Sequence, residues 1–241
     1  MDNVSYVALS AQVSLRHSLD IIANNVANMN TAGFKADRAV FAERVAKMAG
    51  ENEAKGVSFV IDKHSWTDFS AGTVRQTGSD LNVAIAGDGF LAVETPAGIA
   101  YTRDGRFGIS ADGALVNLEG NPVLDVDGAP IQLPPNVGRI SIGRDGIISA
   151  DGAQVARLGV FMPAEPQNMQ KLGNSSFLSD GGLEPVEQPR VMQGMLEDSN
   201  VSGIAEMTRL IGVTRAYGNA DRLSSNADEL KKDAISRIGR A

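Results

Sequence analysis

One stretch near the N-terminus, residues 23–35, constrains the fold of this chain more than any other. It places four asparagines within seven positions: Asn24, Asn25, Asn28 and Asn30. Just upstream, apolar residues recur at steps of three and four, the spacing of one helical stripe: Val4, Ala8, Ala11, Leu15, Leu19, Ile22, Val26 and Met29. Asparagine destabilises a helix interior because its amide competes for nearby backbone groups. We therefore expect these amides to form hydrogen bonds with backbone or side-chain groups of another helix.

The pattern changes at Gly72, where glycine becomes frequent and β-branched residues come in short runs. The dipeptide Asp-Gly occurs seven times, at 88–89, 104–105, 112–113, 127–128, 145–146, 151–152 and 180–181. Asp-Gly suits type I′ turns, in which both central residues need positive φ. Short strands at this spacing predict an all-β domain of antiparallel hairpins over residues 72–188.

The C-terminal part returns to helical spacing. Apolar residues follow one another at alternating steps of three and four, which is a coiled-coil pattern with small residues: Val213, Ala216, Ala220, Leu223, Ala227, Leu230 and Ala234. A helix over residues 202–238 would span roughly 55 Å, longer than the β domain is expected to cover. This apolar seam is therefore expected to pack on the N-terminal stripe of the same or a neighbouring subunit.

Together these patterns predict an α+β fold. Its central domain is all-β with short antiparallel strands and hairpins, and its long N- and C-terminal helices form a coiled-coil assembly region. The expected divisions are an assembly helix at 1–30, a connecting arm at 31–71, the β domain at 72–188, and a linker with the second assembly helix at 189–241. Within the arm, residues 37–48 could form a short helix or an extended segment, and residues 57–61 could form a strand.

Composition excludes several classes of protein. With 241 residues and 43% hydrophobic content, the chain can bury a good core. Its formal charge of −7 and the lack of a basic block argue against nucleic acid or an anionic membrane as partner. The chain has no cysteine, and no apolar run approaches transmembrane length, so we expect no direct membrane insertion. The N-terminus does not have the pattern of a cleaved secretory signal, and composition alone would indicate the cytoplasm.

Three candidate motifs for nucleotide, calcium or metal binding lack the residues that such sites need. Residues 87–92 match a loose dinucleotide fingerprint, but a strand pattern follows where that motif needs a helix. The segment 125–128 hints at a calcium loop, yet the residues after it supply no acidic ligand. His17 and His64 lie apart from any paired acid at metal spacing. We therefore expect no catalytic, cofactor-binding or metal site, and no enzyme.

Several segments instead carry a family resemblance. Ten residues fit a fixed pattern near the N-terminus: Asn24, Asn25, Val26, Ala27, Asn28, Asn30, Thr31, Gly33, Phe34 and Lys35. Further matching segments lie at 72–90, 101–107, 112–116, 120–124, 194–201, 206–211 and 215–217. This set resembles the signatures of the flagellar rod, hook and hook-associated proteins, the axial proteins of the bacterial flagellum. Two departures are Leu91 for a common Phe, and Gly218 where members often carry Glu.

The resemblance implies a structural subunit of the basal-body rod that polymerises through its terminal helices and helps to form a torque-transmitting shaft. The implied partners are proximal and distal rod subunits, copies of itself and the flagellar type III export apparatus. The implied location is the rod in the periplasm, reached without a cleaved signal peptide. The start and length of the chain are most like proximal rod members, and a distal rod or hook-type member is the alternative within the family.

A secreted β-rich carbohydrate-binding module is the alternative from another class. It predicts a cluster of exposed aromatic residues, whereas aromatics make up 5% of this chain and Trp66 is its single tryptophan. We therefore expect an assembly interface in place of a ligand site. Its predicted residues, drawn from both ends of the chain, are Asn24, Asn25, Asn28, Thr31, Gly33, Phe34, Glu206, Met207, Leu210, Ile211, Val213, Ala216, Tyr217, Ala220, Leu223, Ala227 and Leu230.

Overall fold

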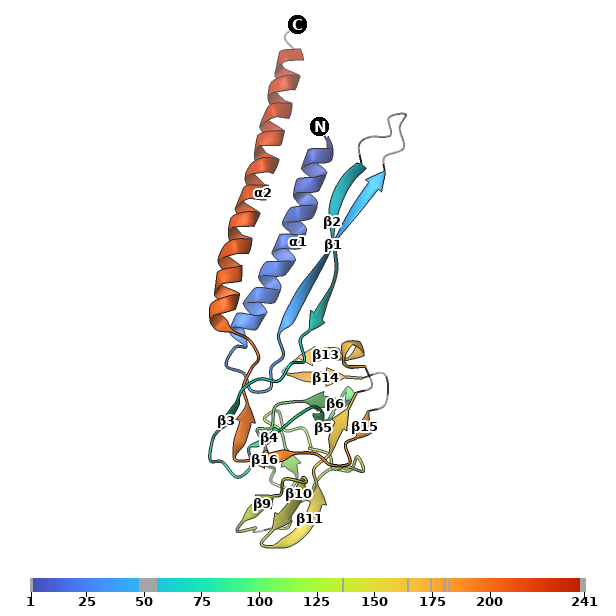
Figure 1. The fold of residues 1–241 in the computed structure, drawn as a ribbon, viewed down its shortest axis with the longest axis vertical. Helices are drawn as coiled ribbons and strands as arrows, with labels where there is room; N and C mark the ends of the chain where they lie inside the picture. Colours follow the sequence, from blue (N-terminus) through green and yellow to red (C-terminus); the bar gives the residue numbers. More distant parts are fainter. Residues whose placement is uncertain are drawn as a thin grey trace. The chain divides into compact units, whose positions relative to one another are not determined.

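A computed structural model describes residues 2–47, 56–135, 137–163, 165–173, 175–179, 181 and 183–238 of the chain. Its contacts divide the chain into two compact units, which Figure 1 draws in one view. The helical unit comprises Met1–Ala27, Asp37–Asp68 and Ser202–Ala241, and the β unit comprises Asn28–Ala36 and Phe69–Val201. The four-part division drawn from the sequence stays a prediction.

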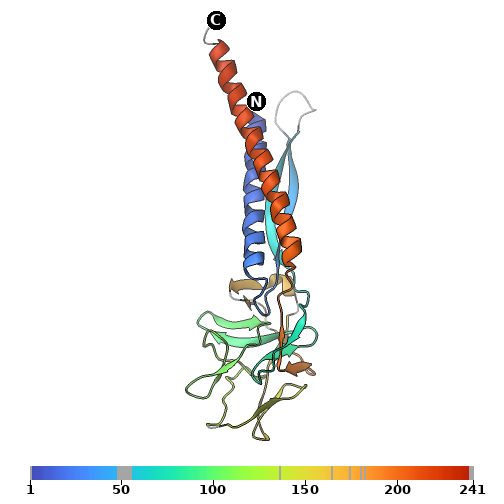
Figure 2. The ribbon, with the colours of Figure 1, turned by 90° about the vertical axis from the view of Figure 1, so that its left-hand side faces the viewer.

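Two antiparallel helices form the helical unit together with a hairpin. Helix α1 spans Asp2–Ala27 and helix α2 spans Gly203–Ile238. They lie side by side in both views, with the N-terminus of α1 and the C-terminus of α2 toward the same end (Figures 1 and 2). The Nε2 atom of Gln12 donates a hydrogen bond to Oδ1 of Asp221 at 3.3 Å, which ties the two helices together midway. The face that α1 buries includes members of the predicted stripe and two serines: Ala8, Ser14, Ser18 and Ile22.

A long β-hairpin accompanies the helices. Strand β1 (Asp37–Lys47) pairs antiparallel with β2 (Gly56–Thr67), with one irregularity in register between Val40 and Phe41. For residues 37–48, which include β1, the sequence was compatible with either a short helix or an extended segment. An isolated two-stranded ribbon is marginal in water, and here both strands contact α1. Tertiary support therefore decides the conformation of this segment.

The predicted coiled-coil assembly region is wrong. The described residues contain two α-helices, one N-terminal and one C-terminal, and a mostly β central region. Along the predicted seam, Ala220 is 8% exposed, but Leu223 is 61% and Leu230 is 66% exposed. The side chain of Ala227 lies outside the described residues. A coiled coil needs its apolar positions buried in a continuous series, and this seam is not.

The β unit consists of short antiparallel strands. Its largest sheet has six strands in the order β13-β14-β6-β5-β12-β15, and a three-stranded sheet has the order β11-β10-β9. Three further pairs are β16-β4, β17-β3 and β7-β8. The strand bounds are β3 Val74–Gln76, β4 Val83–Ile85, β5 Phe90–Thr95, β6 Gly98–Thr102, β7 Gly108–Ile109, β8 Leu115–Val116, β9 Ile140–Ile142, β10 Ile147–Ala150, β11 Ala153–Arg157, β12 Val160–Met162, β13 Gln170–Gly173, β14 Ser176–Leu178, β15 Glu184–Pro185, β16 Val191–Gln193 and β17 Met195–Glu197. A short 3₁₀ turn, Pro166–Asn168, precedes β13.

Aliphatic side chains fill the main core of the β unit, and aromatic side chains form a second cluster. The main core gathers Val83, Leu91, Val93, Leu115, Ile131, Ile148 and Leu158, each at most 1% exposed. In the second cluster, the rings of Phe69, Phe90 and Phe177 meet edge to face. These three phenylalanines pack on one another inside the unit and offer no platform for a sugar.

The turns are more varied than the Asp-Gly count suggests. Among the described residues, only Asp151 and Gly152 both have positive φ, 50° and 89°. They form the two-residue connection between β10 and β11, as a type I′ hairpin requires. At the other described Asp-Gly pairs the aspartate has negative φ, so those pairs serve other turn types.

Candidate assembly site

Asn25 is the most deeply buried asparagine of the N-terminal signature. Its side chain is 1% exposed. Its Oδ1 accepts a hydrogen bond from the backbone N–H of Asp37 at 3.0 Å, and its Nδ2 donates to the Asp37 carbonyl at 2.9 Å. One amide thus satisfies both backbone groups where β1 begins. The partner is a strand of the same chain, whereas the sequence suggested another helix.

Asn28 and Thr31 form a local turn within the β unit. The Thr31 N–H donates to the Asn28 carbonyl at 3.1 Å, and the Thr31 hydroxyl donates to Asn28 Oδ1 at 3.2 Å. Both side chains are half-buried, and Asn24 is exposed on α1. Asn28 and Thr31 thus belong to the β unit, whereas Asn24 and the predicted α2 residues belong to the helical unit.

Gly33 and Phe34 pack against the segment that precedes α2. The Gly33 N–H donates to the Glu197 carbonyl at 2.8 Å, and the Asn200 N–H donates to the Phe34 carbonyl at 3.3 Å. Gly33 has φ +67°, and a Cβ there would lie 2.4 Å from the carbonyl carbon of Arg103. Phe34 is 3% exposed, with Lys171 Nζ 4.2 Å from its ring centroid. Segments from the two ends of the chain thus meet inside the β unit.

A buried ion cluster fixes that meeting point. Lys35 Nζ lies 2.6 Å from Glu197 Oε1 and donates at 2.7 Å to the Ser70 carbonyl. Arg103 Nη1 donates to Glu197 Oε2 at 3.0 Å, and the Gly72 N–H donates to Oε1 at 2.9 Å. All three charged side chains are nearly inaccessible to water. Because both cations pair with a single carboxylate, removing Glu197 would leave two buried positive charges without a counter-ion.

None of the three charged residues of this cluster is among the predicted interface residues. Lys35, Arg103 and Glu197 all stand in the signature segments, and Lys35 lies between the apolar residues Phe34 and Ala36. That context was the available signal, because a charge is rarely buried unless it is paired. What the sequence could not supply is the pairing itself.

Glu206 forms a second ion cluster, within the helical unit. It is 2% exposed, and its Oε1 accepts from Arg38 Nη1 at 2.7 Å and from Arg209 Nη1 at 2.9 Å. Its Oε2 is buried and has no hydrogen-bond partner among the described residues. Glu206 therefore joins the first turns of α2 to the start of β1.

The other predicted α2 residues fall into two groups by exposure. Leu210, Val213, Ala216 and Tyr217 are half-buried and Ala220 is buried. Met207, Ile211, Leu223 and Leu230 are exposed by 50%, 55%, 61% and 66%. Ile204 in α2 and Leu9 and Val13 in α1, which the prediction omitted, are exposed by 83%, 55% and 60%. Exposed large apolar side chains in such number are the feature of this unit that most needs a partner.

The described residues contain no group of three or more His, Cys, Asp or Glu side chains that could hold a metal ion. Over the same part of the chain, no helix combines the length and hydrophobicity needed to span a bilayer.

Comparison with known proteins places these features. Three flagellar families match the chain: Flagella basal body rod protein over residues 6–35, Flagellar hook protein FlgE/F/G D1 domain over 84–150, and Flagellar basal body rod FlgEFG protein C-terminal over 192–237. The flagellar basal-body rod protein FlgF of Caulobacter vibrioides is 39% identical over 100% of this chain and 99% of its own length. FlgF of Rhizobium meliloti is 40% identical over 97% of both chains. FlgG of Bacillus subtilis is 30% identical over 95% of this chain and 97% of its own length.

The chain therefore belongs to the flagellar basal-body rod protein family, and it is a structural subunit of the basal-body rod. Within the family it is a rod protein like FlgF, the relative that it matches at 39–40% identity over nearly its full length. This confirms the resemblance drawn from the signatures and the location in the basal-body rod. Membership of this family also supports interaction with other rod and hook subunits.

Proposed function

We propose that this chain polymerises through its helical unit, contacts copies of itself and proximal and distal rod subunits, and carries torque without catalysing a reaction. We further propose that it reaches the periplasmic rod through the flagellar type III export apparatus. The torque-bearing role requires contacts on more than one face of the unit, because a shaft is an open assembly built from repeated, non-closing contacts.

The observation that carries the proposal is the apolar outer face of the helices. Ile204, Met207 and Ile211 follow one another at steps of three and four on α2, and all are at least 50% exposed. A helix that serves only its own subunit presents polar residues on its outward face. Leu9 and Val13 give α1 an exposed apolar pair of its own. Neighbouring subunits that cover these side chains would remove them from water, which favours assembly.

The test compares Ile211→Glu with the matched variant Ile211→Leu in a strain that lacks the wild-type chain. Because Ile211 is exposed, Ile211→Glu is expected to leave the unfolding transition of the purified protein unchanged. It is expected to abolish motility and to remove the chain from isolated basal bodies, whereas Ile211→Leu keeps both. Normal motility and normal incorporation with Glu at this position would contradict the proposal.

The absence of catalysis is tested on the purified protein. Hydrolase and redox assays are expected to give no turnover. A turnover that one point substitution abolishes would show an enzyme and would contradict a purely structural role.

A further inference from the structure

A groove opens within the helical unit between α1, β1 and α2, with a volume of about 410 Å³. Apolar side chains from all three elements line much of it, among them Ile22, Ala39 and Val213. This volume lies within the range of natural binding pockets. The groove is therefore large enough for apolar side chains from another molecule.

Charged groups line the same groove. Two arginines and two carboxylates contribute to its walls, Arg38 and Arg209 with Asp37 and Glu206, so the lining has no net charge. Each arginine gives one N–H to Glu206 Oε1, out of the five that a guanidinium carries. Arg209 is 52% exposed, so its planar fork is open to a carboxylate from outside the unit. The groove thus suits an apolar side chain that has a carboxylate beside it.

Gly212 leaves space along the groove. It lines the groove from within α2, and a Cβ at this position would meet nothing within 4 Å. Glycine inside a helix lowers stability relative to alanine. Glycine at position 212 therefore does not stabilise the isolated subunit. A side chain at this position would begin from an unobstructed Cβ beside the groove.

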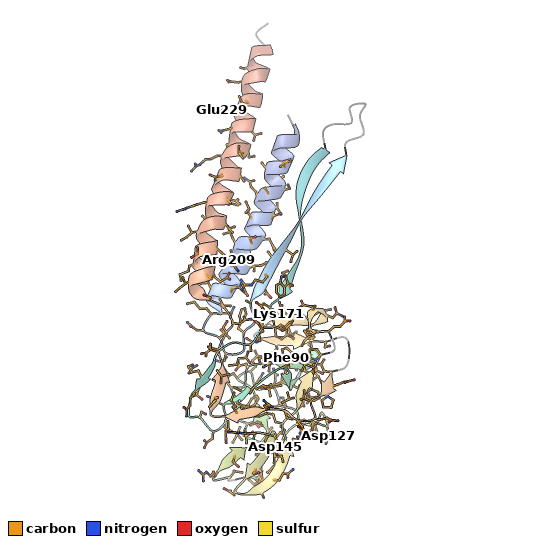
Figure 3. All side chains as sticks on the ribbon, viewed as in Figure 1. Phe90, Asp127, Asp145, Lys171, Arg209 and Glu229 are labelled. Atoms are coloured by element: carbon orange, nitrogen blue, oxygen red, sulfur yellow. The ribbon has the colours of Figure 1, made fainter. Side chains whose placement is uncertain are left out.

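The same helix carries a matching surface in its C-terminal half. Leu223 and Leu230 are exposed by 61% and 66%, and their seven-residue spacing puts them on one face of α2. Exposed carboxylates at Asp228, Glu229 and Asp233 lie close to Leu230 in the sequence, with Lys232 among them. Figure 3 shows Arg209 near the start of α2 and Glu229 toward its far end. The groove and the leucine pair therefore cannot meet within one subunit.

We propose that the groove binds the Leu223–Leu230 face of a second copy of this chain. The inference rests on the proposed polymerisation through the helical unit and specifies its contact. Leucine side chains enter the apolar part of the groove, and a carboxylate beside Leu230 pairs with Arg209. Because the two complementary surfaces lie in different halves of α2, the contact is head-to-tail and leaves one unused groove and one unused leucine face at the two ends of a row. A contact of this kind generates an open row of subunits.

The experiment measures self-association of the full-length chain by sedimentation velocity. Gly212→Leu blocks the groove and Leu230→Gln removes the apolar side chain that enters it. Each variant alone is expected to self-associate about tenfold or more weakly than the wild type, the factor that corresponds to 1.4 kcal/mol. Gly218→Leu is the matched control, because Gly218 also has nothing within 4 Å of a Cβ but does not line the groove. Melting temperatures verify that all three variants fold.

Mixing the two defective variants distinguishes a head-to-tail contact from a symmetric one. An equimolar mixture is expected to form a dimer and stop, because one intact groove meets one intact leucine face. The proposal is overturned if the mixture associates no better than its components, or if Gly212→Leu associates as strongly as Gly218→Leu. A wild-type chain that stays monomeric yet is incorporated into basal bodies also overturns this contact, while the rod role tested at Ile211 still stands.

Discussion

Lys35 and Glu197 lie 162 positions apart in the sequence, yet Lys35 Nζ is 2.6 Å from Glu197 Oε1 in a pair almost wholly shielded from water. Glu197 also accepts from Arg103 and from the Gly72 backbone. One carboxylate thus connects the N-terminal signature, the segment before β3, the end of β6 and the end of β17.

Lys35→Met is expected to destabilise the β unit by about 1.5–3 kcal/mol, because it removes the buried charge-assisted hydrogen bonds from Lys35 to Glu197 and to the Ser70 carbonyl. Urea denaturation of the purified chain measures the effect. The matched control is Arg75→Met, which breaks the nearby pair of Arg75 and Asp198, whose side chains are 58% and 34% exposed. A surface pair of this kind contributes about 0–1 kcal/mol. Equal losses for the two variants would refute a stabilising role for the buried cluster.

Gly33→Ala is expected to destabilise the chain for two separable reasons. Positive φ costs a non-glycine residue roughly 1–2 kcal/mol, and the new Cβ would lie 2.4 Å from Arg103 backbone. Gly128→Ala is the control, since Gly128 has φ +82° but nothing within 4 Å of a Cβ. Denaturant unfolding is expected to show a larger loss at Gly33 than at Gly128. Similar losses at both positions would show that the close approach of Gly33 to the Arg103 backbone does not contribute to the effect.

Asn25→Ala is expected to lower stability by about 1–3 kcal/mol for each Asp37 backbone group that remains buried and unpaired. The hairpin should loosen first, because those groups stand at the beginning of β1. Hydrogen exchange at β1 amides reports this locally. Asn30→Ala, at an exposed position of the turn after α1, is the control and is expected to change stability by less than about 0.5 kcal/mol. Unchanged exchange in the Asn25 variant would contradict the assignment.

Ala220→Glu is expected to destabilise the helical unit of the isolated chain. Ala220 is 8% exposed, so a carboxylate there would lose its hydration without gaining a counter-ion. Leu230→Glu, at a position that is 66% exposed, is expected to leave the monomer intact. Circular dichroism melts compare the two. A melt of the Ala220 variant that matches the Leu230 variant would show that Ala220 is not internal to the subunit.

Alkaline pH is expected to weaken the β unit through Tyr101. Burial raises the pKa of the Tyr101 hydroxyl above its ordinary value. The unfolded chain therefore ionises first, and the stability contributed by the neutral hydroxyl is complete below pH ~10 and is lost as pH rises toward the folded-state pKa. Tyr101→Phe is expected to flatten the loss of unfolding free energy above that pH. An identical slope in both proteins would contradict this assignment.

The local spacing of apolar residues predicted part of this architecture. Steps of three and four predicted a helix over 202–238, and α2 spans Gly203–Ile238. The same spacing does not show how far along α2 other elements pack against it. It therefore predicted burial for Leu223 and Leu230 as well as for Ala220. For β1, the apolar residues fit no single period well, and pairing with β2 together with contact to α1 settles the strand.

The candidate site was harder to predict, because most of its contacts span long distances in sequence. The asparagine cluster indicated that an amide would find a partner, but the partner of Asn25 is a strand that the sequence did not clearly predict. Lys35 and Glu197 each stood within a quoted signature, and nothing in either segment specifies the other. Exposure of Met207 and Ile211 likewise depends on which face of α2 the rest of the unit covers.

The long separation between Lys35 and Glu197 also constrains when this protein can finish folding. A ribosome releases the N-terminal signature first, so Lys35 and Arg103 emerge well before the carboxylate that pairs with both. Until residue 197 is available, their final positions would hold two positive charges with no counter-ion. Contacts of such high sequence separation also slow folding. The chain therefore remains unfinished through most of its synthesis, and a product truncated before Glu197 cannot complete the junction between its two ends.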